Sequence, residues 1–477
     1  MTGQLTIKEE KRRSYILNGN LWKTVLVLTL PLAIYQLFNF LYGFIDMLLV
    51  ADLGSSFINS VVFIDEIKSA TSAFGGAIAA AGTVMVARHY GANELKEARK
   101  NAGNSVLLGL SVSTLVIFGM VIFGTPILEF FGATPDMVEN GLPYYNVQMI
   151  TTGLIAFNSV FIGLEKAKGN TKTVLWLNMI VMIVKLILSV LWIKVFGGDL
   201  FHLALASLIA QGLLTVIGLL IMIHPKNSIR ISWKDLKPDW KLMYSILVLA
   251  IPVFIGKFLF NMGKVVINGI ALLYHPFAVG ALGISYKVHN AFSQTANSFE
   301  ESEMSIISQN IGNKRLDRAL KTYGIALVYA SSIAIFGMIV AYFWQDFVIN
   351  LFIQDGIDYV DKFNLTREIY AFEQFSAITG AVIAATSGMF IAFKKTKVVF
   401  WINILRVIVL RLPVIWFLYY FVDPTATWHV GFVMLFSNTI TMILSLVFAI
   451  VFVHNLKNYG YDRLQLIQAE ELINKTS

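Results

Sequence analysis

Twelve apolar stretches, each long enough to cross a lipid bilayer, run through this chain. A helix needs about 20 mostly apolar residues to span about 30 Å of hydrocarbon. Stretches of that length begin near Trp22, Phe57, Asn104, Met137, Thr173, Phe201, Leu242, Phe277, Ala319, Leu365, Val398 and Thr427. Charged residues make up 14% of the 477 residues and apolar residues 57%, a balance unusual for a soluble domain. The sequence therefore predicts an all-α membrane protein with twelve transmembrane helices.

The distribution of charge predicts how the chain is oriented. Most of the 37 Lys and Arg residues fall in the N-terminus, in every second loop and in the C-terminal tail. Cytoplasmic segments carry such an excess of positive residues, so we expect both termini in the cytoplasm of a multi-pass protein of the inner or plasma membrane. The net charge of +8 follows from this topology, and no nucleic-acid partner is expected. The apolar run 22–50 is too long for a signal-peptide core, so we expect no cleaved targeting peptide.

The two halves of the chain are repeats of each other. An offset of 221 residues superposes Leu30-Pro31 on Ile251-Pro252 and 87–91 on 308–312, and an offset of 225 superposes 176–178 on 401–403. Six helices separate the copies, so the sequence predicts two six-helix bundles related by a pseudo-two-fold axis along the membrane normal. We expect a cytoplasmic N-terminus (1–21), an N-terminal lobe (22–224), a cytoplasmic linker (225–241) of amphipathic character, a C-terminal lobe (242–456) and a cytoplasmic tail (457–477). Two repeats suffice to build a cavity, so a monomer is expected.

Several short motifs mark this architecture further. They are Asn18-Gly19-Asn20-Leu21-Trp22 before Leu30-Pro31, Asp46 in the first helix, Tyr90-Gly91-Ala92, Lys168-Gly169-Asn170-Thr171-Lys172, and Gln309-Asn310-Ile311-Gly312 with Arg318. Over nearly the whole chain they resemble the multidrug and toxic compound extrusion (MATE) transporters of the multidrug/oligosaccharidyl-lipid/polysaccharide flippase superfamily. The resemblance implies two lobes in a V around a central cavity, alternating access, and antiport that exports drugs or natural products in exchange for Na⁺ or H⁺.

The resemblance also implies a cation-coupling site in the N-terminal lobe. The family's first-helix carboxylate falls on Asp46, and its usual partners on the fifth and sixth helices align with Lys185, Ser189 and Ser207. We predict that the Lys185 ammonium contacts Asp46 where a Na⁺ ion would sit, because an ion pair in a low dielectric favours both charged forms. The alternative is that Lys185 snorkels or pairs elsewhere and has no role in transport.

The C-terminal lobe carries more ionisable groups than membrane helices tolerate without a reason. They are Lys257, Lys264, Glu300, Glu301, Glu303, Arg406 and Arg411. We predict that attraction gathers them into one network that lines the substrate cavity. Four cations would repel a lipophilic cation, so a zwitterionic or anionic substrate is expected. The alternative is a salt-bridge network that only makes the lobe rigid.

Other functional classes fit the sequence less well. The chain has no Cys, its seven His residues are scattered without ligand spacing, and it contains neither a phosphate-binding loop nor a Ser–His constellation. We therefore expect no enzyme, no metal and no cofactor. A channel is a further alternative, although the repeats favour alternating access. A flippase for a lipid-linked anionic precursor stays open, since clustered Lys and Arg would suit a pyrophosphate headgroup.

Overall fold

Helices make up almost all of the computed structural model, which describes residues 5–53, 55–130, 135–232, 235–353 and 358–460. The predicted tail beyond residue 460 lies outside the described residues. The α-helices are α1 (Ile7–Asn18), α2 (Leu21–Leu53), α3 (Ser55–Gly91), α4 (Leu95–Ile122), α5 (Gly124–Phe130), α6 (Pro135–Ala167), α7 (Thr171–Val190), α8 (Leu200–Ile223), α9 (Trp240–Tyr274), α10 (Ala278–Gly312), α11 (Leu316–Phe352), α12 (Tyr359–Glu373), α13 (Ser376–Ala392), α14 (Thr396–Ile404), α15 (Leu412–Phe417) and α16 (Trp428–Tyr459). Short π-helical segments follow α7 (Leu191–Val195), α14 (Leu405–Arg411) and α15 (Leu418–Val422).

Eleven spans within the described residues are long and apolar enough to cross a membrane. The remaining predicted span, the eighth along the chain, is α10, which has 35 residues but carries Lys287 and three glutamates and is therefore less apolar. The tenth span is broken between α12 and α13, and the eleventh is interrupted by π-helical turns. Several helices begin before their apolar stretch, α4 at Leu95 rather than near Asn104, because helical turns continue into water beyond the hydrocarbon.

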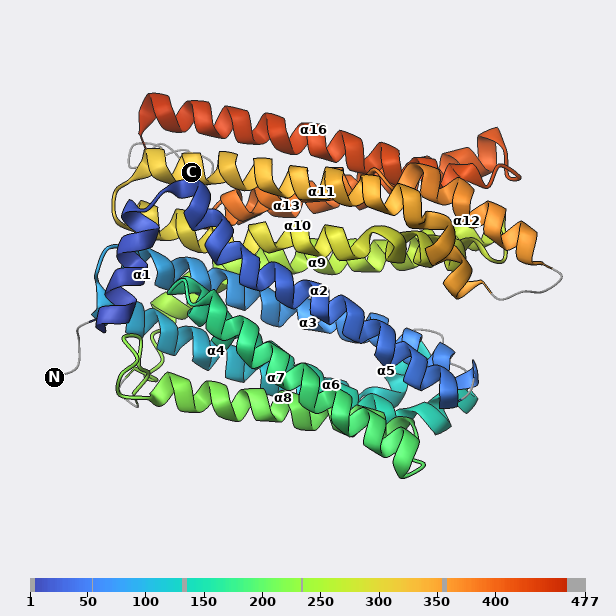
Figure 1. The fold of residues 1–477 in the computed structure, drawn as a ribbon, viewed down its shortest axis with the longest axis horizontal. Helices are drawn as coiled ribbons and strands as arrows, with labels where there is room; N and C mark the ends of the chain where they lie inside the picture. The colour runs from blue at the N-terminus through green and yellow to red at the C-terminus, as the bar shows by residue number, and fades with distance from the viewer. Residues whose placement is uncertain (1–4, 54, 131–134, 233–234, 354–357, 461–477) are drawn as a thin grey trace, which may run out of the picture.

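The helices form two groups, each built mainly from one half of the chain. In the first half α3 packs against α4 and α6, and in the second half α10 packs against α11 and α13. The groups meet where α2 contacts α10 and where α3 contacts both α9 and α10. Figure 1 shows them side by side at the end that carries α1 and spread apart toward α5 and α12.

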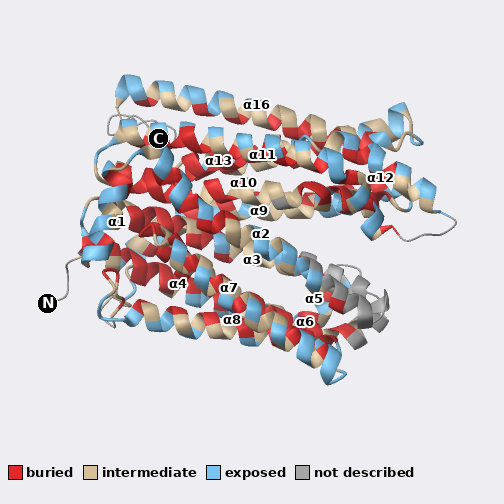
Figure 2. Ribbon diagram, in the orientation of Figure 1, coloured by how far each residue is buried: buried red, intermediate tan, exposed pale blue. Residues whose placement is uncertain are grey.

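Burial follows the arrangement expected for a chain dissolved in lipid. Large apolar side chains such as Leu115, Phe343 and Trp401 are exposed on the outer faces, while charged side chains such as Glu165, Lys168 and Arg411 are buried. Figure 2 shows the buried residues concentrated where the helices converge near α1. A bilayer favours this pattern because it solvates apolar side chains and leaves polar groups to be satisfied inside the protein.

Two loop conformations recur at the offsets that relate the halves. Asn93 and Lys314 both have a left-handed backbone, with φ of 66° and 58°. Gly169 and Lys394 likewise have φ of 71° and 62°. Both turns follow a helix that ends at the side of the molecule where the halves meet. The second half therefore repeats the turns of the first with lysine in positions that favour Asn or Gly.

Replacing Lys394 with Gly should raise the free energy of unfolding by more than about 1 kcal/mol at neutral pH, because relief of the backbone and loss of a buried charge add. A left-handed residue with a side chain costs about 1–2 kcal/mol, part of which the greater chain entropy of Gly offsets. Lys394 lies between two spans, and burial, with a smaller effect of Arg88, lowers its pKa to about 8. The charge on Lys394 therefore lowers the free energy of unfolding, and this loss is complete below about pH 8. Between pH 8 and the ordinary lysine pKa of 10.5 the unfolded chain binds more protons than the folded chain, so the loss becomes smaller as pH rises.

Thermal unfolding in detergent at several pH values tests this expectation. The gain in Tm from Lys394→Gly should shrink between pH 8 and 10. Lys314→Gly is the matched control for the backbone term alone. A gain from Lys394→Gly that stays constant with pH would show that the buried charge contributes nothing.

The two halves approach each other closely at a symmetric pair of glycines. A Cβ atom added to Gly91 would overlap the carbonyl group of Gln309, and one added to Gly312 would overlap the carbonyl group of Arg88. Gly91 and Arg88 correspond to Gly312 and Gln309 at the 221-residue offset, so the two contacts are reciprocal. The ends of α3 and α10 therefore cross backbone to backbone, where only glycine fits.

Helix α1 bridges the two halves across this crossing. Arg13 donates from Nε to the carbonyl oxygen of Tyr90 (3.0 Å) and from Nη2 to that of Gly91 (2.6 Å), at the end of α3. At the end of α1 the carbonyl oxygens accept hydrogen bonds from the other half, from Arg315 to Leu17 and from Arg318 to Ile16 and Gly19. These guanidinium groups satisfy carbonyls that a helix C-terminus leaves free.

The described residues of the linker, 225–232 and 235–239, form turns and irregular backbone. Its backbone packs on the first half, where the carbonyl oxygen of Ser228 accepts a hydrogen bond from Arg99 and the backbone N–H of Asp239 donates one to Asn104. Ser228 also donates from its N–H and its hydroxyl to Glu9 of α1. Burial raises the pKa of Glu9, but the hydrogen bonds from Thr6 and Ser228 outweigh it and hold that pKa below its usual value. The linker thus helps to anchor α1.

Candidate functional site

Asp46 and Lys185 form an ion pair inside the first half. Lys185 Nζ, on α7, lies 3.2 Å from Asp46 Oδ2, on α2, and their side chains are 18% and 28% exposed. Tyr42, one turn before Asp46, donates its hydroxyl to Asp46 Oδ1 at 2.9 Å, and the Lys185 ammonium lies 4.6 Å from the centre of its ring. The contact predicted between these helices is present. Its part in coupling stays a prediction.

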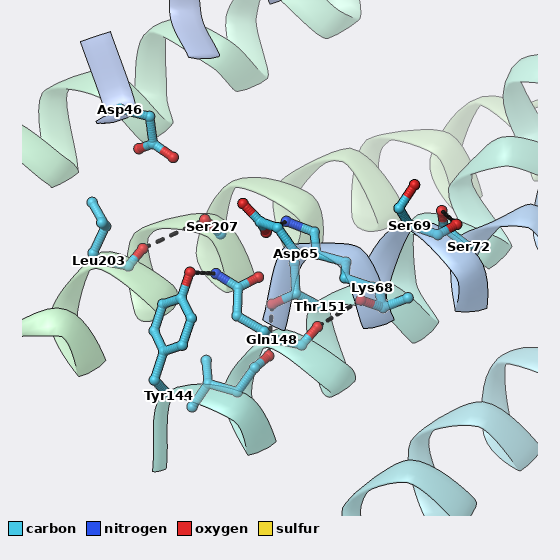
Figure 3. A network of polar contacts seen from close by, with 12 residues as sticks. Asp46, Asp65, Lys68, Ser69, Ser72, Tyr144, Gln148, Thr151, Leu203 and Ser207 are labelled. Atoms are coloured by element: carbon cyan, nitrogen blue, oxygen red, sulfur yellow. Dashed lines mark hydrogen bonds and ion pairs between the residues drawn. The ribbon is translucent and has the colours of Figure 1, made fainter. Parts of the chain in front are cut away.

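The other two residues aligned with the family's coupling site differ in their contacts. Ser189 is fully buried one turn after Lys185. Ser207, on α8, donates to the carbonyl oxygen of Leu203 in its own helix at 3.4 Å. Figure 3 shows Asp46, Asp65 and Ser207 in one view, with the hydrogen bond from Ser207 to Leu203 drawn as a dashed line. Asp65 pairs with Lys68 at 3.4 Å and lies within electrostatic reach of Lys185.

The acidic residues of α10 do not join one network, which corrects the sequence prediction. Glu300 lies 3.8 Å from Lys257 of α9. Glu301 instead pairs across the halves with Lys166 of α6 at 2.6 Å. Successive helical residues point about 100° apart, so adjacent glutamates face different partners. The Glu301–Lys166 pair is one of the contacts that hold the halves together near α1.

Glu303 takes a third direction, into the C-terminal group of helices. It is fully buried, and its carboxylate lies against Gly388 of α13. Within the described part of the chain no ion pair reaches it. At the 221-residue offset its counterpart is Gly82, so the carboxylate belongs to one half alone.

The three remaining cations of the predicted set gather around one aromatic ring. Lys264 Nζ lies 4.8 Å from the centre of the Phe260 ring, Arg406 Cζ 4.7 Å and Arg411 Cζ 6.0 Å. Lys264 also lies 5.8 Å from the ring centre of Tyr286. We call Lys264, Arg406 and Arg411 the cationic cluster.

Neutral side chains of α16 hold the two arginines of this cluster. Arg406 Nε and Arg411 Nη2 both donate to Asn438 Oδ1 at 2.6 Å, and Arg411 Nε donates to Ser437 Oγ at 2.9 Å. Asn438 donates to Ser376 Oγ at 2.6 Å. Ser376 in turn donates to Glu373 Oε2 at 2.9 Å. One amide oxygen therefore accepts from two guanidinium groups, and hydrogen bonds through Ser376 and Asn438 connect Glu373 to them.

Sequence reasoning missed Lys166 and the Ser437-Asn438 pair. Lys166 lies near the end of α6, where a basic residue reads as part of the cytoplasmic charge. Ser437 and Asn438 stand in the middle of an apolar span, and polar groups there need partners. Their position in the middle of an apolar span was the sequence feature that could have identified Ser437 and Asn438.

The chain has relatives among known families and proteins. The MatE family model matches residues 31–191 and 252–417, more than half of the chain, in two segments that begin at the superposed prolines, so the predicted repeat is confirmed. The multidrug export protein MepA of Staphylococcus saprophyticus is 21% identical over 286 residues, covering 59% of this chain and 62% of that protein. MepA of Staphylococcus haemolyticus is 20% identical over 331 residues, covering 68% and 72%. The chain thus matches less than two thirds of the first relative's length.

Solved structures share the fold over almost the whole chain. An outward-facing multidrug resistance MATE family transporter of the MOP superfamily superposes with a TM-score of 0.88 at 17% identity, covering 95% of this chain and 99% of that chain. A MOP superfamily transporter from Pyrococcus furiosus, described as having a binding pocket of reverse polarity, superposes with a TM-score of 0.87 at 16% identity over the same shares. These neighbours confirm the predicted fold of two six-helix bundles.

Proposed function

Because the chain belongs to the MatE family, we propose that it is a secondary antiporter that exports a small organic molecule, with H⁺ rather than Na⁺ as its driving ion. The observation that carries the proposal is the ion pair of Asp46 and Lys185. A tethered ammonium already neutralises the carboxylate that would otherwise bind Na⁺. A proton can still compete for Asp46, whereas a metal cation would first have to displace Lys185.

The geometry suggests how a proton would act there. Asp46 accepts both the Tyr42 hydroxyl and the Lys185 ammonium. Protonating Asp46 removes the charge that stabilises Lys185 in a low dielectric, so Lys185 must gain water or another partner. Rearrangement of α2 against α7 would meet that need and would link protonation to movement of the lobe.

The arrangement of the two groups of helices supports alternating access. They touch through the crossing of α3 with α10 and through Glu301–Lys166, and they diverge toward the other end (Figure 1). We propose that the end bearing α1 faces the cytoplasm, where most positive charge lies, in an inner or plasma membrane. We further propose that one chain suffices for transport, since both halves of the cavity come from it.

Efflux from proteoliposomes under an imposed pH or Na⁺ gradient tests the proposal. A fluorescent naphthalenesulfonate serves as the probe because the cationic cluster favours an anionic substrate. Ethidium is the cationic alternative because the MepA relatives are multidrug export proteins. A pH gradient should drive efflux by the wild type, and Asp46→Asn should lose at least about 90% of it. Efflux that follows only the Na⁺ gradient would contradict the proposal.

A further inference from the structure

Two arginines of the C-terminal half lie inside the protein with no acidic side chain in direct contact among the described residues. Arg411 is 3% exposed and Arg406 is partly buried. Their hydrogen bonds go to the neutral side chains of Ser437 and Asn438, and within the described residues neither forms an ion pair. A guanidinium withdrawn from water costs several kcal/mol unless an opposite charge compensates it. The two buried guanidinium groups therefore favour the binding of an anion beside them.

A local change of helix geometry brings the two arginines together. In an α-helix, residues five apart point about 140° away from each other. Arg406 and Arg411 lie on the π-helical segment Leu405–Arg411, whose i to i+5 hydrogen bonds bring residues five apart to the same side of the helix. At the 225-residue offset their counterparts are Val181 and Leu186, in a regular part of α7. The paired guanidinium groups therefore belong to the C-terminal half alone.

The surroundings of the pair add positive charge and aromatic surface. Lys264 contributes a third cation beside Phe260, while Glu373 is the carboxylate within electrostatic reach of both arginines. Tyr286 leaves 43% of its surface exposed. These side chains come from α9, α10, α12 and the π-helical segment, so they converge inside the C-terminal group rather than on its lipid face.

We propose that Arg406 and Arg411 form an oxyanion-binding fork for the carboxylate, sulfonate or phosphate group of an amphipathic aromatic substrate. Arginine donates in a planar fork that suits such groups. Lys264 adds attraction, and Phe260 and Tyr286 offer ring faces to the apolar part of the molecule. This inference rests on the proposed function and names its substrate class, an organic anion or a zwitterion bound through its anionic end.

Equilibrium binding of tritiated 1-naphthalenesulfonate to the full chain in phosphatidylcholine nanodiscs tests the fork. Wild type should bind the probe and bind the neutral 1-naphthalenemethanol at least tenfold more weakly. Arg406→Gln should weaken probe binding at least tenfold. Arg367→Gln is the matched control, an arginine of the same half that lies 3.7 Å from Asp346 with more than half of its side chain exposed, and it should change binding less than twofold.

Asn438→Asp provides a variant that keeps the packing intact. A carboxylate there would pair with both guanidinium groups, so thermal stability should be kept or raised while probe affinity falls at least tenfold. Wild-type affinity in a folded Asn438→Asp protein would overturn the proposal. So would loss of probe binding when phosphatidylglycerol is added to the nanodiscs, because the fork would then hold a lipid headgroup.

The binding assay needs no gradient, so it separates this inference from the proposed function. Specific probe binding without gradient-driven efflux would leave the fork standing and remove the antiport. Efflux of ethidium driven by pH, together with a probe affinity equal in wild type and Arg406→Gln, would leave the antiport standing and remove the fork.

Discussion

Lys185→Ala should convert the protein from indifference to Na⁺ to dependence on it. Without the ammonium, Asp46 would stand in a low dielectric with the Tyr42 hydroxyl as its one hydrogen-bond donor among the described side chains, and a free cation would restore the missing charge. We expect a Na⁺ gradient to raise efflux at least about tenfold in Lys185→Ala and less than twofold in the wild type. Proteoliposomes loaded with the same substrate, at equal pH on both sides, provide the measurement.

Two further variants make this result specific. Lys68→Ala removes a nearby ammonium that pairs with Asp65, and it should leave the response to Na⁺ unchanged. The double variant Asp46→Asn with Lys185→Ala should lose the Na⁺ response again, because nothing is left to bind the ion. Equal Na⁺ stimulation in the single and double variants would place ion binding away from Asp46.

Gly312→Ala should force the two halves apart at the end bearing α1. The new methyl group would meet the carbonyl group of Arg88, and backbone cannot turn aside as a flexible side chain can. Overpacking of this kind costs about 1–3 kcal/mol, which shifts the population of this closed end by about five- to more than a hundredfold. We expect gradient-driven efflux to fall at least tenfold, because a transporter that closes poorly at one end leaks instead of alternating.

Cysteine labelling can follow this opening, since the chain has no Cys of its own. Ser305 is 1% exposed and donates to the carbonyl oxygen of Lys166 between the halves. A maleimide should therefore label Ser305→Cys slowly, and faster once Gly312→Ala is added. Gly324→Ala, where a Cβ meets open space, is the control. Unchanged labelling and efflux in Gly312→Ala would show that the crossing tolerates a side chain.

The fold and the N-terminal ion pair could both be predicted from the sequence, the fold from regular features and the pair from the family resemblance. Span lengths, charge asymmetry and the superposed prolines depend only on hydrocarbon thickness and on the repeat. The contact of Asp46 with Lys185 required two residues to be placed on facing helices, which the family resemblance supplied.

The C-terminal cluster needed information that a sequence does not contain. Glu300, Glu301 and Glu303 are close in sequence and suggest one acidic patch. In the helix they point in different directions, so Glu300 lies near Lys257, Glu301 pairs with Lys166 and Glu303 is buried in the interior. Arg406 and Arg411 look like residues of opposite faces until a π-helical segment aligns them. Such local departures from α geometry arise from packing, which single-residue preferences do not predict.

The placement of α1 constrains how the halves can separate. Its carbonyl end is capped by Arg315 and Arg318 at the start of α11, whereas Arg13 within it caps the end of α3. If the two halves part at this end, α1 can travel with one of them only, so each cycle must break one set of these hydrogen bonds and later remake it. The N-terminal helix would then act as a latch whose release sets an upper limit on turnover, and a weaker latch would give a faster but less tightly closed transporter.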